Sequence, residues 1–554
     1  MRWWPVAVGV ALLLAGCAGW AGTEGRVSEA EKRFFAQNEL VFARVDFTDL
    51  EVARRLVVSF EAVSARYGEG YLLLELSLQD FARLRARERE LGLRVSLDTG
   101  LSEQQSRRLR GFEEGALAEA LRDFPCYRTL EETFAAARRI VAEHPALAAW
   151  ADIGDSWRKG FASRFARSGH DLGVLELTNR AVAGPKPRLF ITSALHAREL
   201  ATAELATRFA EHLVGAYGTD PDVTWLLDHH EVHLLLQANP DGRELAEAGI
   251  LWRKNVNLLA CPLSRARRGV DLNRNFGFEW GTAGSSAESC SETYRGSAPA
   301  SEPETRAIQA YLRRSYPDVR GPALADAAPA DAQGLYLDLH SYGELVLWPW
   351  GNRETPAPNG PALQTLGRKL AFFNGYTPTQ AIGFYPTSGT TDDFAYGELG
   401  LAAYTLELGT SFFEGCTEFE DEILPRNLPA LLYAAKVARA PYQLPSGPDA
   451  LEPALSGTTL TATLDDSRFS RARGTEPTQP IAAAEFYIDT PPWASGAQPH
   501  PMTPGDGRFD AVREAAWAEV PTAGLAPGRH LVFVRGQDAA GNWGPVSAVF
   551  LEVR

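Results

Sequence analysis

Positive charge is scarce in this sequence, which holds 55 lysines and arginines against 70 aspartates and glutamates and has a formal net charge of -15. Nucleic-acid binding depends on basic stripes that contact phosphates, so we expect no nucleic-acid partner. After residue 17 no apolar stretch approaches membrane-spanning length, and internal repeats are absent. The composition, with 45% hydrophobic, 23% charged and 10% aromatic residues, is typical of soluble globular proteins. A chain of 554 residues has room for roughly two to four domains.

Residues 1–17 have the features of an export signal. Arg2 supplies a positive start, Val6 to Leu14 is an apolar run too short to span a bilayer, and small residues follow. The last four residues end in Cys17 and are similar to the lipobox of bacterial lipoproteins, which are cut before the cysteine and carry lipid on it. A plain secretory signal is the alternative. We expect an exported chain, lipid-anchored in the cell envelope (at the outer membrane or surface) through Cys17 alone.

Five cysteines are consistent with export. If Cys17 carries lipid, four cysteines remain, and four cysteines allow three pairings. An oxidising compartment favours forming disulfides, and four buried free thiols are the alternative. The remaining cysteines are Cys126, Cys261, Cys290 and Cys416.

The spacing of apolar residues divides the rest of the chain into regions. Residues 28–115 alternate helices and strands and predict a small α/β domain that ends in a polar helical connector. Residues 120–440 alternate helices with short apolar strands, which indicates an α/β domain whose mixed sheet has helices on both faces. Pro441 to Pro453 is rich in Pro, Gly and Ser and predicts a linker. Residues 455–554 have strand-like runs, Gly/Pro turns and no long helix, which is typical of an immunoglobulin- or fibronectin-like β-sandwich.

Two short segments carry the strongest chemical signal. His196 and Glu199 are three residues apart, so both can face one ion, and His340 follows a distant apolar strand. Two imidazoles and a carboxylate are the ligands of a catalytic zinc site, whose fourth position stays open for water. A lone histidine more often packs or caps, but these three residues together predict one zinc ion. Such an ion lowers the pKa of its water towards about 7 and polarises a carbonyl.

Hydrolysis also needs a general base near that water. Glu407 lies in an apolar segment, where it would be a carboxylate at the end of a buried strand, and such burial is costly without a partner. A glutamate facing solvent from an edge strand is the alternative. Arg253, Asn273 and Arg274 offer groups that bind carboxylates or stabilise an oxyanion, although arginines of this kind are more often surface charges.

Together these segments resemble the zinc carboxypeptidase family of the carboxypeptidase A and B type. The resemblance covers about residues 125–440 and keeps the motifs in the family's order, including Asn-Pro-Asp-Gly at 239–242, Cys-Ser-Glu-Thr-Tyr at 290–294 and His-Ser-Tyr at 340–342. It implies a metallocarboxypeptidase-like fold and hydrolysis of the C-terminal bond of peptides or proteins. We expect the enzyme to be a monomer.

The resemblance also implies a role for each matching residue. His196, Glu199 and His340 would bind zinc. Glu407 would deprotonate the zinc-bound water and pass the proton to the leaving amine, and Arg253 would stabilise the tetrahedral oxyanion.

Further matching residues would bind the substrate. Asn273 and Arg274 would grip its terminal carboxylate, Tyr385 would close over that carboxylate, and Arg198 would contribute to the next subsite inward. Asp392 falls at the position that determines which C-terminal side chain of the substrate the family prefers. Aspartate at this position accompanies a preference for C-terminal Lys or Arg, as in carboxypeptidase B. The surrounding segment resembles the B type, although Phe394 replaces the usual Trp.

The resemblance bears on the cysteines and on the N-terminal region as well. The family's disulfide would join Cys261 to Cys290, and Cys126 would then pair with Cys416. Residues 28–115 occupy the place of the family's propeptide. Cleavage near residues 107–110 would activate the enzyme and free it from its anchor, and a permanent spacer is the alternative.

Two other functions stay open at this point. A zinc amidohydrolase acting on cell-wall peptides or acyl-amino acids would also bind a substrate carboxylate through Asn273 and Arg274. A catalytically dead surface-binding protein is the second, and it predicts a missing ligand or base. No expected ligand or base is missing from the sequence.

Overall fold

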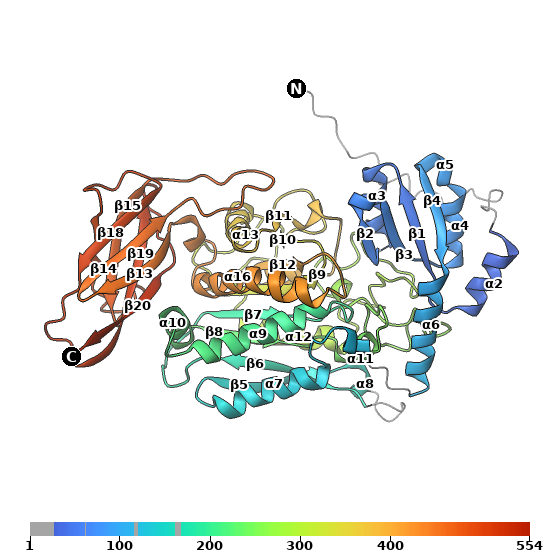
Figure 1. Cartoon of the computed structure of the whole chain (residues 1–554), viewed down its shortest axis with the longest axis horizontal. Helices are drawn as coiled ribbons and strands as arrows, with labels where there is room; N and C mark the ends of the chain where they lie inside the picture. The colour runs from blue at the N-terminus through green and yellow to red at the C-terminus, as the bar shows by residue number, and fades with distance from the viewer. Residues whose placement is uncertain (1–26, 61, 116–119, 161–167) are drawn as a thin grey trace, which may run out of the picture. The chain divides into compact units, whose positions relative to one another are not determined.

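An eight-stranded mixed sheet spans the middle of the chain, in the strand order β11-β10-β12-β9-β7-β8-β6-β5 (Figure 1). Strands β12, β9, β7 and β8 are parallel to one another, whereas β10 pairs antiparallel with β12, β6 with β8 and β5 with β6. The bounds are β5 Ala148–Asp155, β6 Asp171–Leu177, β7 Arg188–Thr192, β8 Glu231–Leu235, β9 Leu335–Ser341, β10 Leu345–Trp348, β11 Thr377–Gln380 and β12 Ala402–Leu408.

The computed structural model describes residues 27–60, 62–115, 120–160 and 168–554. It divides into two compact units, residues 1–114 and 115–554. The predicted export signal with Cys17 lies outside the described residues. Within the described ranges, no helix has both the length and the apolar character needed to cross a bilayer.

Strands β9 and β12 are buried along their whole length. Strands covered on both faces are built from nearly continuous apolar residues, which explains the hydrophobic runs that predicted them. His340 lies inside β9, not just past the strand as the sequence indicated. The acids Asp338 and Glu407 and the imidazole of His340 thus lie in a largely apolar interior.

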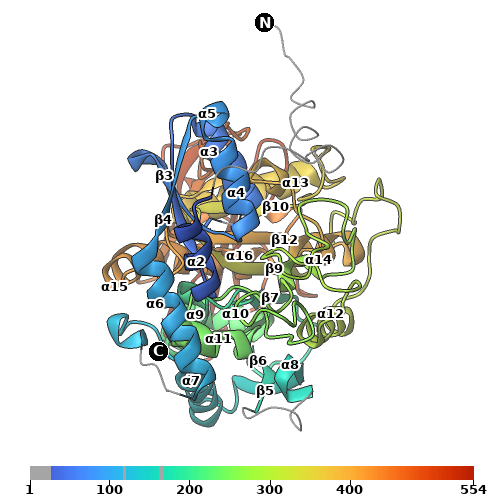
Figure 2. The ribbon, with the colours of Figure 1, turned by 90° about the vertical axis from the view of Figure 1, so that its right-hand side faces the viewer.

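Helices cover both faces of this sheet. Helices α9 and α16 contact each other and the central strands, while α14 contacts β9 and β12 and α12 contacts β5. Figure 2 shows α12 and α14 on the opposite side of the strands from α9 and α16. The bounds are α7 Leu130–Glu143, α8 Trp157–Gly160, α9 Leu200–Ala216, α10 Pro221–His229, α11 Pro240–Glu247, α12 Pro303–Ser315, α13 Gly360–Asn374, α14 Thr391–Leu399, α15 Cys416–Glu418 and α16 Leu424–Val437.

The first unit is a small α/β module whose antiparallel sheet has the order β2-β3-β1-β4. Ser28, Ser77 and Asp98 cap its helices by accepting backbone N–H groups, as short polar side chains do at helix starts. The bounds are α2 Glu29–Gln37, β1 Phe42–Phe47, α3 Leu50–Phe60, β2 Ser64–Arg66, β3 Tyr71–Glu75, α4 Leu78–Ala86, α5 Glu88–Leu91, β4 Leu93–Asp98 and α6 Thr99–Glu113.

The C-terminal region holds two four-stranded antiparallel sheets, β13-β14-β18-β17 and β16-β15-β19-β20, around one apolar core. The expected fold class, a helix-flanked mixed sheet with additional all-β sheets, is confirmed. The bounds are β13 Asp449–Ser456, β14 Thr459–Asp465, β15 Ile481–Ile488, β16 His500–Pro501, β17 Thr503–Pro504, β18 Arg513–Glu519, β19 Gly528–Asp538 and β20 Ser547–Val553.

The linker predicted over Pro441 to Pro453 is wrong. This segment contains a 3-10 turn at Leu444–Ser446, and β13 begins at Asp449. Buried Lys369 of α13 donates to Asp449 at 3.1 Å, and buried charges of this kind need a partner. The neighbouring Arg368 donates from Nη1 to the carbonyl oxygens of Ser470, Ala472 and Gly474. The sandwich is therefore braced on the helix that packs against β10 and β11.

Both expected disulfides are present. Cys126 pairs with Cys416 and Cys261 with Cys290. The first joins positions 290 residues apart and ties the segment before α7 to the start of α15. The second closes a local loop between Arg253 and α12. Such cross-links stabilise a fold mainly by restricting the unfolded chain.

Candidate metal and substrate site

A tight turn after β7 presents His196 and Glu199. Ala194 adopts a positive φ of 54°, a conformation that is uncommon for residues other than glycine and that marks functional turns more often than ordinary ones. The Thr202 hydroxyl accepts from the Ala194 N–H and donates to the Glu199 carbonyl. This hydroxyl closes the turn and places Glu199 directly before α9.

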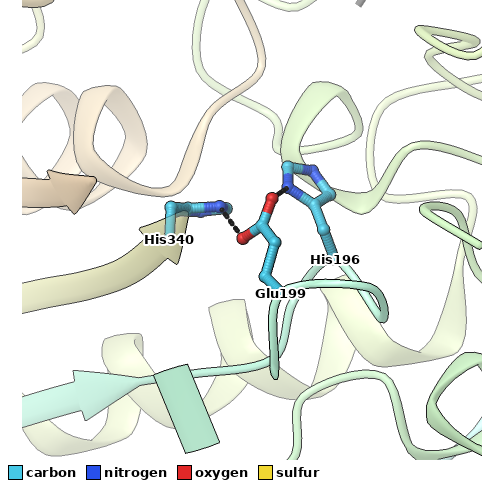
Figure 3. Close-up of side chains that lie close together, drawn as sticks. All are labelled: His196, Glu199 and His340. Carbon is cyan, nitrogen blue, oxygen red and sulfur yellow. Dashed lines mark hydrogen bonds and ion pairs between the residues drawn. The ribbon is translucent and has the colours of Figure 1, made fainter. Parts of the chain in front are cut away.

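The side chains of His196, Glu199 and His340 converge from two distant segments. Figure 3 shows both imidazole rings directed at the Glu199 carboxylate. Nδ1 of His196 lies 2.8 Å from Oε1 of Glu199, and Nδ1 of His340 lies 2.9 Å from Oε2. One ligand atom from each residue falls within 4.8 Å of the others. The structure thus brings together the three predicted ligands, all of them buried.

Carboxylates hold the outer nitrogen of each ring. Nε2 of His196 lies 3.0 Å from Oδ1 of Asp271, and Nε2 of His340 lies 2.9 Å from Oδ2 of Asp338. Metal-binding histidines usually have such a partner on the second nitrogen, which fixes the tautomer and the orientation of the ring. Neither aspartate was predicted from the sequence, although Asp338 stands two residues before His340 and so faces the same side of β9.

The charge balance suits a divalent cation. Burial opposes ionisation of Glu199, but the two imidazoles outweigh it and hold the pKa of this carboxyl well below its usual range. Burial likewise opposes protonation of His340, but Asp338 and Glu199 raise its pKa well above the ordinary value. Two imidazole nitrogens and an ionised carboxylate are the donor set of catalytic zinc sites. The residues present therefore fit a zinc ion.

Strand register places Glu407 beside His340. Strand β12 pairs in parallel with β9, and Glu407 is directly opposite His340. Directly paired residues share a face of the sheet with Cβ atoms about 4.5–5.5 Å apart. Glu407 is 9% exposed, so the interpretation of this residue as a solvent-facing edge glutamate is wrong.

Arg253 is linked to His196 through Asp271. Its Nε and Nη2 donate to Oδ2 of Asp271 at 3.1 and 2.9 Å, while Oδ1 of Asp271 contacts Nε2 of His196. Burial would raise the pKa of Asp271, but the charges of Arg253, Arg274 and His196 hold it well below its usual value. One carboxylate therefore orients both an arginine and a candidate zinc ligand.

Asn273 and Arg274 lie in a 3-10 turn at Leu272–Arg274, and both are buried. Nδ2 of Asn273 is 3.2 Å from Nε2 of His340, and its Oδ1 accepts from the N–H of Thr391. Arg274 donates from Nε to the carbonyl of Gly284, and its guanidinium carbon lies 5.8 Å from the centre of the half-buried Tyr385 ring. The structure thus gathers these predicted substrate-binding residues on one side of the metal site.

Arg198 lies between the two ligands of the His196–Glu199 turn and is fully buried. Its guanidinium stacks 4.1 Å from the centre of the Phe412 ring and donates to the carbonyl of Leu251. Among the described residues, none accepts a hydrogen bond from Nε or Nη2 of Arg198. Buried donors of this kind are costly unless something else binds them.

Asp392 and Asp393 lie in the first turn of α14, and we call them the pocket acids. Asp392 is 4% exposed and accepts from the backbone N–H of Asp393, whose own carboxylate accepts from the N–H of Gly351. Burial raises the pKa of each carboxyl above its usual value. Across the described ranges, no lysine or arginine forms an ion pair with either residue.

Comparisons with known proteins agree with this arrangement. A family model described as zinc carboxypeptidase matches residues 135–427. Carboxypeptidase A1 of Rattus norvegicus is 28% identical over 335 residues, which cover 59% of this chain and 72% of that protein. A zinc carboxypeptidase of Saccharothrix mutabilis subsp. capreolus is 31% identical over 300 residues, covering 52% and 63%. Carboxypeptidase B of Bos taurus is 32% identical over 248 residues, covering 43% and 55%.

Solved structures with a similar fold include carboxypeptidase A from Helicoverpa armigera, at a TM-score of 0.54 and 22% identity, covering 73% of this chain and 98% of that one. Thrombin activatable fibrinolysis inhibitor is similar at a TM-score of 0.53 and 21% identity, covering 72% and 98%. At these identities the likeness concerns the fold alone.

Proposed function

The chain belongs to the zinc carboxypeptidase family, and on that premise we propose that it removes C-terminal Lys or Arg residues from peptides and proteins. One observation carries the choice of substrate. Asp392 is a buried carboxylate beside the metal-facing residues, and no cation of the described chain pairs with it. A lysine or arginine side chain of the substrate would supply the missing charge.

In this proposal His196, Glu199 and His340 hold one zinc ion. The inward Nδ1 atoms and the carboxylate partners of both Nε2 atoms support that role. Zinc supplies a Lewis acid that acidifies water and polarises the scissile carbonyl. Asp271 and Asp338 keep the two imidazoles in the orientation that binds it.

Glu407 is the proposed general base and acid. It takes a proton from the attacking water while the water oxygen bonds to the carbonyl carbon. It then gives that proton to the amine nitrogen as the carbon–nitrogen bond breaks. General catalysis of this kind contributes about 10²- to 10⁴-fold. The position of Glu407 opposite His340 in the sheet supports this role.

Arg253 is the proposed oxyanion stabiliser. Asp271 holds its guanidinium from Nε and Nη2, so the charge is oriented before the substrate arrives. Donors fixed in advance stabilise a developing oxyanion because they need no reorganisation during the reaction.

The proposed contacts to the substrate carboxylate come from Asn273, Arg274 and Tyr385. A guanidinium can bind a carboxylate through two parallel hydrogen bonds, and the Tyr385 ring already lies beside Arg274. Recognition of a free carboxylate is what restricts hydrolysis to the last bond. Arg198, whose Nε and Nη2 find no acceptor in the described part of the chain, would bind the residue before that bond.

Asp392 is the proposed selectivity group. An arginine or lysine side chain would pair with it, whereas an apolar side chain would leave a buried charge without a partner. Burial raises the pKa of Asp392, and a bound cation would lower it again.

A panel of matched peptides ending in Arg, Lys, Phe and Leu tests the substrate, with a muropeptide and an acyl-amino acid as further arms. Each is assayed with and without a chelator. We expect release of Arg and Lys to be fastest and the chelator to abolish it. Faster release of Phe than Arg contradicts the basic preference. Hydrolysis confined to the muropeptide or acyl-amino acid contradicts peptidase function, and no hydrolysis at all indicates a binding protein.

The proposal extends to the N-terminal region. Residues 28–115 would act as a propeptide, and cleavage near residues 107–110 would activate the enzyme. Trypsin treatment should raise activity and yield a fragment starting near 109–125. Unchanged activity without this fragment would identify a permanent spacer.

The predicted lipid on Cys17 would anchor the exported chain in the envelope. Metabolic labelling with a radioactive fatty acid should mark the wild type and not Cys17→Ala. Equal labelling of both chains would rule out this anchor.

A further inference from the structure

Asp338 is a fully buried carboxylate that the proposed reaction does not use directly. It lies on β9, and three side chains bind it. Its Oδ1 accepts from the Thr192 hydroxyl at 2.6 Å. Its Oδ2 accepts from the Thr391 hydroxyl at 2.5 Å and lies 2.9 Å from Nε2 of His340. Oδ2 of Asp338 therefore contacts both the candidate zinc ligand His340 and Thr391, the first residue of α14.

The partners of Asp338 differ from those of the matching acid on the other histidine. Asp271 holds His196 and is itself held by the guanidinium of Arg253. Asp338 has no arginine or lysine partner among the described residues, and hydroxyls from β7 and α14 hold it instead. A shift of α14 would therefore move Asp338 and the ring that it orients.

Asn273 lies beside the same atoms and fixes the backbone of Thr391. Asn273 accepts from the N–H of Thr391 through Oδ1, and its Nδ2 lies 3.2 Å from Nε2 of His340. Because Nε2 of His340 donates to Asp338 when Nδ1 faces the metal position, it cannot accept from the Asn273 amide, so the hydrogen-bonded route from the first turn of α14 to His340 runs through Asp338. The next residue of that turn is Asp392, the proposed selectivity group.

We propose that Asp338 is a positioning residue that couples the zinc ligand His340 to the placement of Asp392. The inference rests on the proposed function, because it assumes the roles of both residues. Its consequence is that one carboxylate sets both the affinity for zinc and the preference for a basic C-terminal side chain. By linkage, a cation bound at Asp392 would then also change the affinity for zinc.

The test compares three isosteric variants of the full chain, Asp338→Asn, Asp271→Asn and Asp392→Asn. Zinc affinity is measured by competition with a chelator, and selectivity as the ratio of kcat/KM for peptides ending in Arg and Phe. Carboxylates behind zinc-binding histidines typically contribute about 10- to 100-fold in metal affinity. We expect Asp338→Asn to weaken zinc binding by about that factor and also to lower the Arg:Phe ratio at least about threefold.

The other two variants separate these effects. Asp271→Asn should weaken zinc binding and leave the Arg:Phe ratio unchanged. Asp392→Asn should lower the ratio and leave zinc affinity within about twofold. If Asp338→Asn changes only one of the two quantities, or neither, the coupling is wrong. A wild type without a preference for Arg would instead contradict the proposed function, so the two failures are distinguishable.

Thr391→Val keeps the proposal testable if Asp338→Asn does not fold, as judged by the melting temperature of the metal-free chain. This variant keeps the shape of the side chain and removes only the hydroxyl that donates to Asp338. We expect it to lower the Arg:Phe ratio and to weaken zinc binding, each by about threefold. Unchanged values for both would overturn the proposal as well.

Discussion

Two groups of buried acids lie close together in this protein and are satisfied in opposite ways. At the metal end, Glu199, Asp271 and Asp338 each bond to an imidazole, and Asp271 also binds a guanidinium. At the pocket end, Asp392 accepts from the backbone N–H of Asp393 and Asp393 from that of Gly351, and within the described ranges neither forms an ion pair with a lysine or arginine.

The difference separates two uses of a buried charge. An acid with an internal partner fixes the geometry of that partner, which is what a metal site requires. An acid whose charge has no internal partner costs free energy until a ligand supplies one. Under the proposed function, the metal end therefore serves the chemistry, and Asp392 at the pocket end serves the choice of substrate.

The largest expected effect comes from Glu407→Gln, which alters the chemistry and leaves the pocket intact. The variant keeps the size of the side chain but cannot accept the proton of water. Turnover should fall about 10²- to 10⁴-fold, with zinc still bound and the residual Arg:Phe ratio unchanged. Zinc content per chain and single-turnover rates measure this. A variant that retains a tenth or more of the wild-type rate would assign the base to another residue.

Arg253→Ala should come next. Its loss removes the charge proposed for the oxyanion, so kcat should fall by about 10²–10³ while KM changes little. Arg253→Lys is the control, because it keeps the charge but not the two-point contact with Asp271, and it should recover part of the rate. Equal activity of the wild type and the alanine variant would remove Arg253 from the mechanism.

Asp392→Asn removes the carboxylate at the pocket end and leaves the metal end unchanged. We expect the Arg:Phe ratio of kcat/KM to fall about 10²-fold, because a charged hydrogen bond to the substrate cation is lost. The rate for Phe should not fall. Asp393→Asn is the matched control, since its carboxylate is bound to Gly351, and its ratio should change far less. If the two variants behave alike, the distinction between the neighbouring acids is wrong.

The pH dependence of selectivity gives the smallest effect. Burial raises the pKa of Asp392, so protonation removes its charge at a higher pH than for an exposed aspartate. The Arg:Phe ratio should therefore decline as the pH falls, by up to about tenfold per unit below that pKa, and begin to do so above the usual aspartate range. Asp392→Asn should show a flat profile. A ratio that rises on acidification would contradict the assignment.

The sequence indicated most of the fold through spacing and composition. Apolar runs located the buried strands of the central sheet, such as residues 335–339, because a strand covered on both faces must be apolar throughout. The linker prediction failed at residues 441–453 because proline is also tolerated in edge strands and at bulges, and Pro453 lies at the bulge of the edge strand β13. Local composition does not reveal that Asp449 forms an ion pair with the buried Lys369 of α13.

Residue types and their order were enough to select the three candidate ligands, the base and the arginines, because few combinations of side chains carry zinc chemistry. Only the tertiary structure could show how they are held. Strand register puts Glu407 opposite His340. Contacts across 53 residues bring Thr391 to Asp338, and contacts across 75 residues bring Asp271 to His196. Such partners depend on which strands and helices become neighbours in the fold. Hydrogen bonds between residues so far apart in the sequence produce no periodic pattern along the chain.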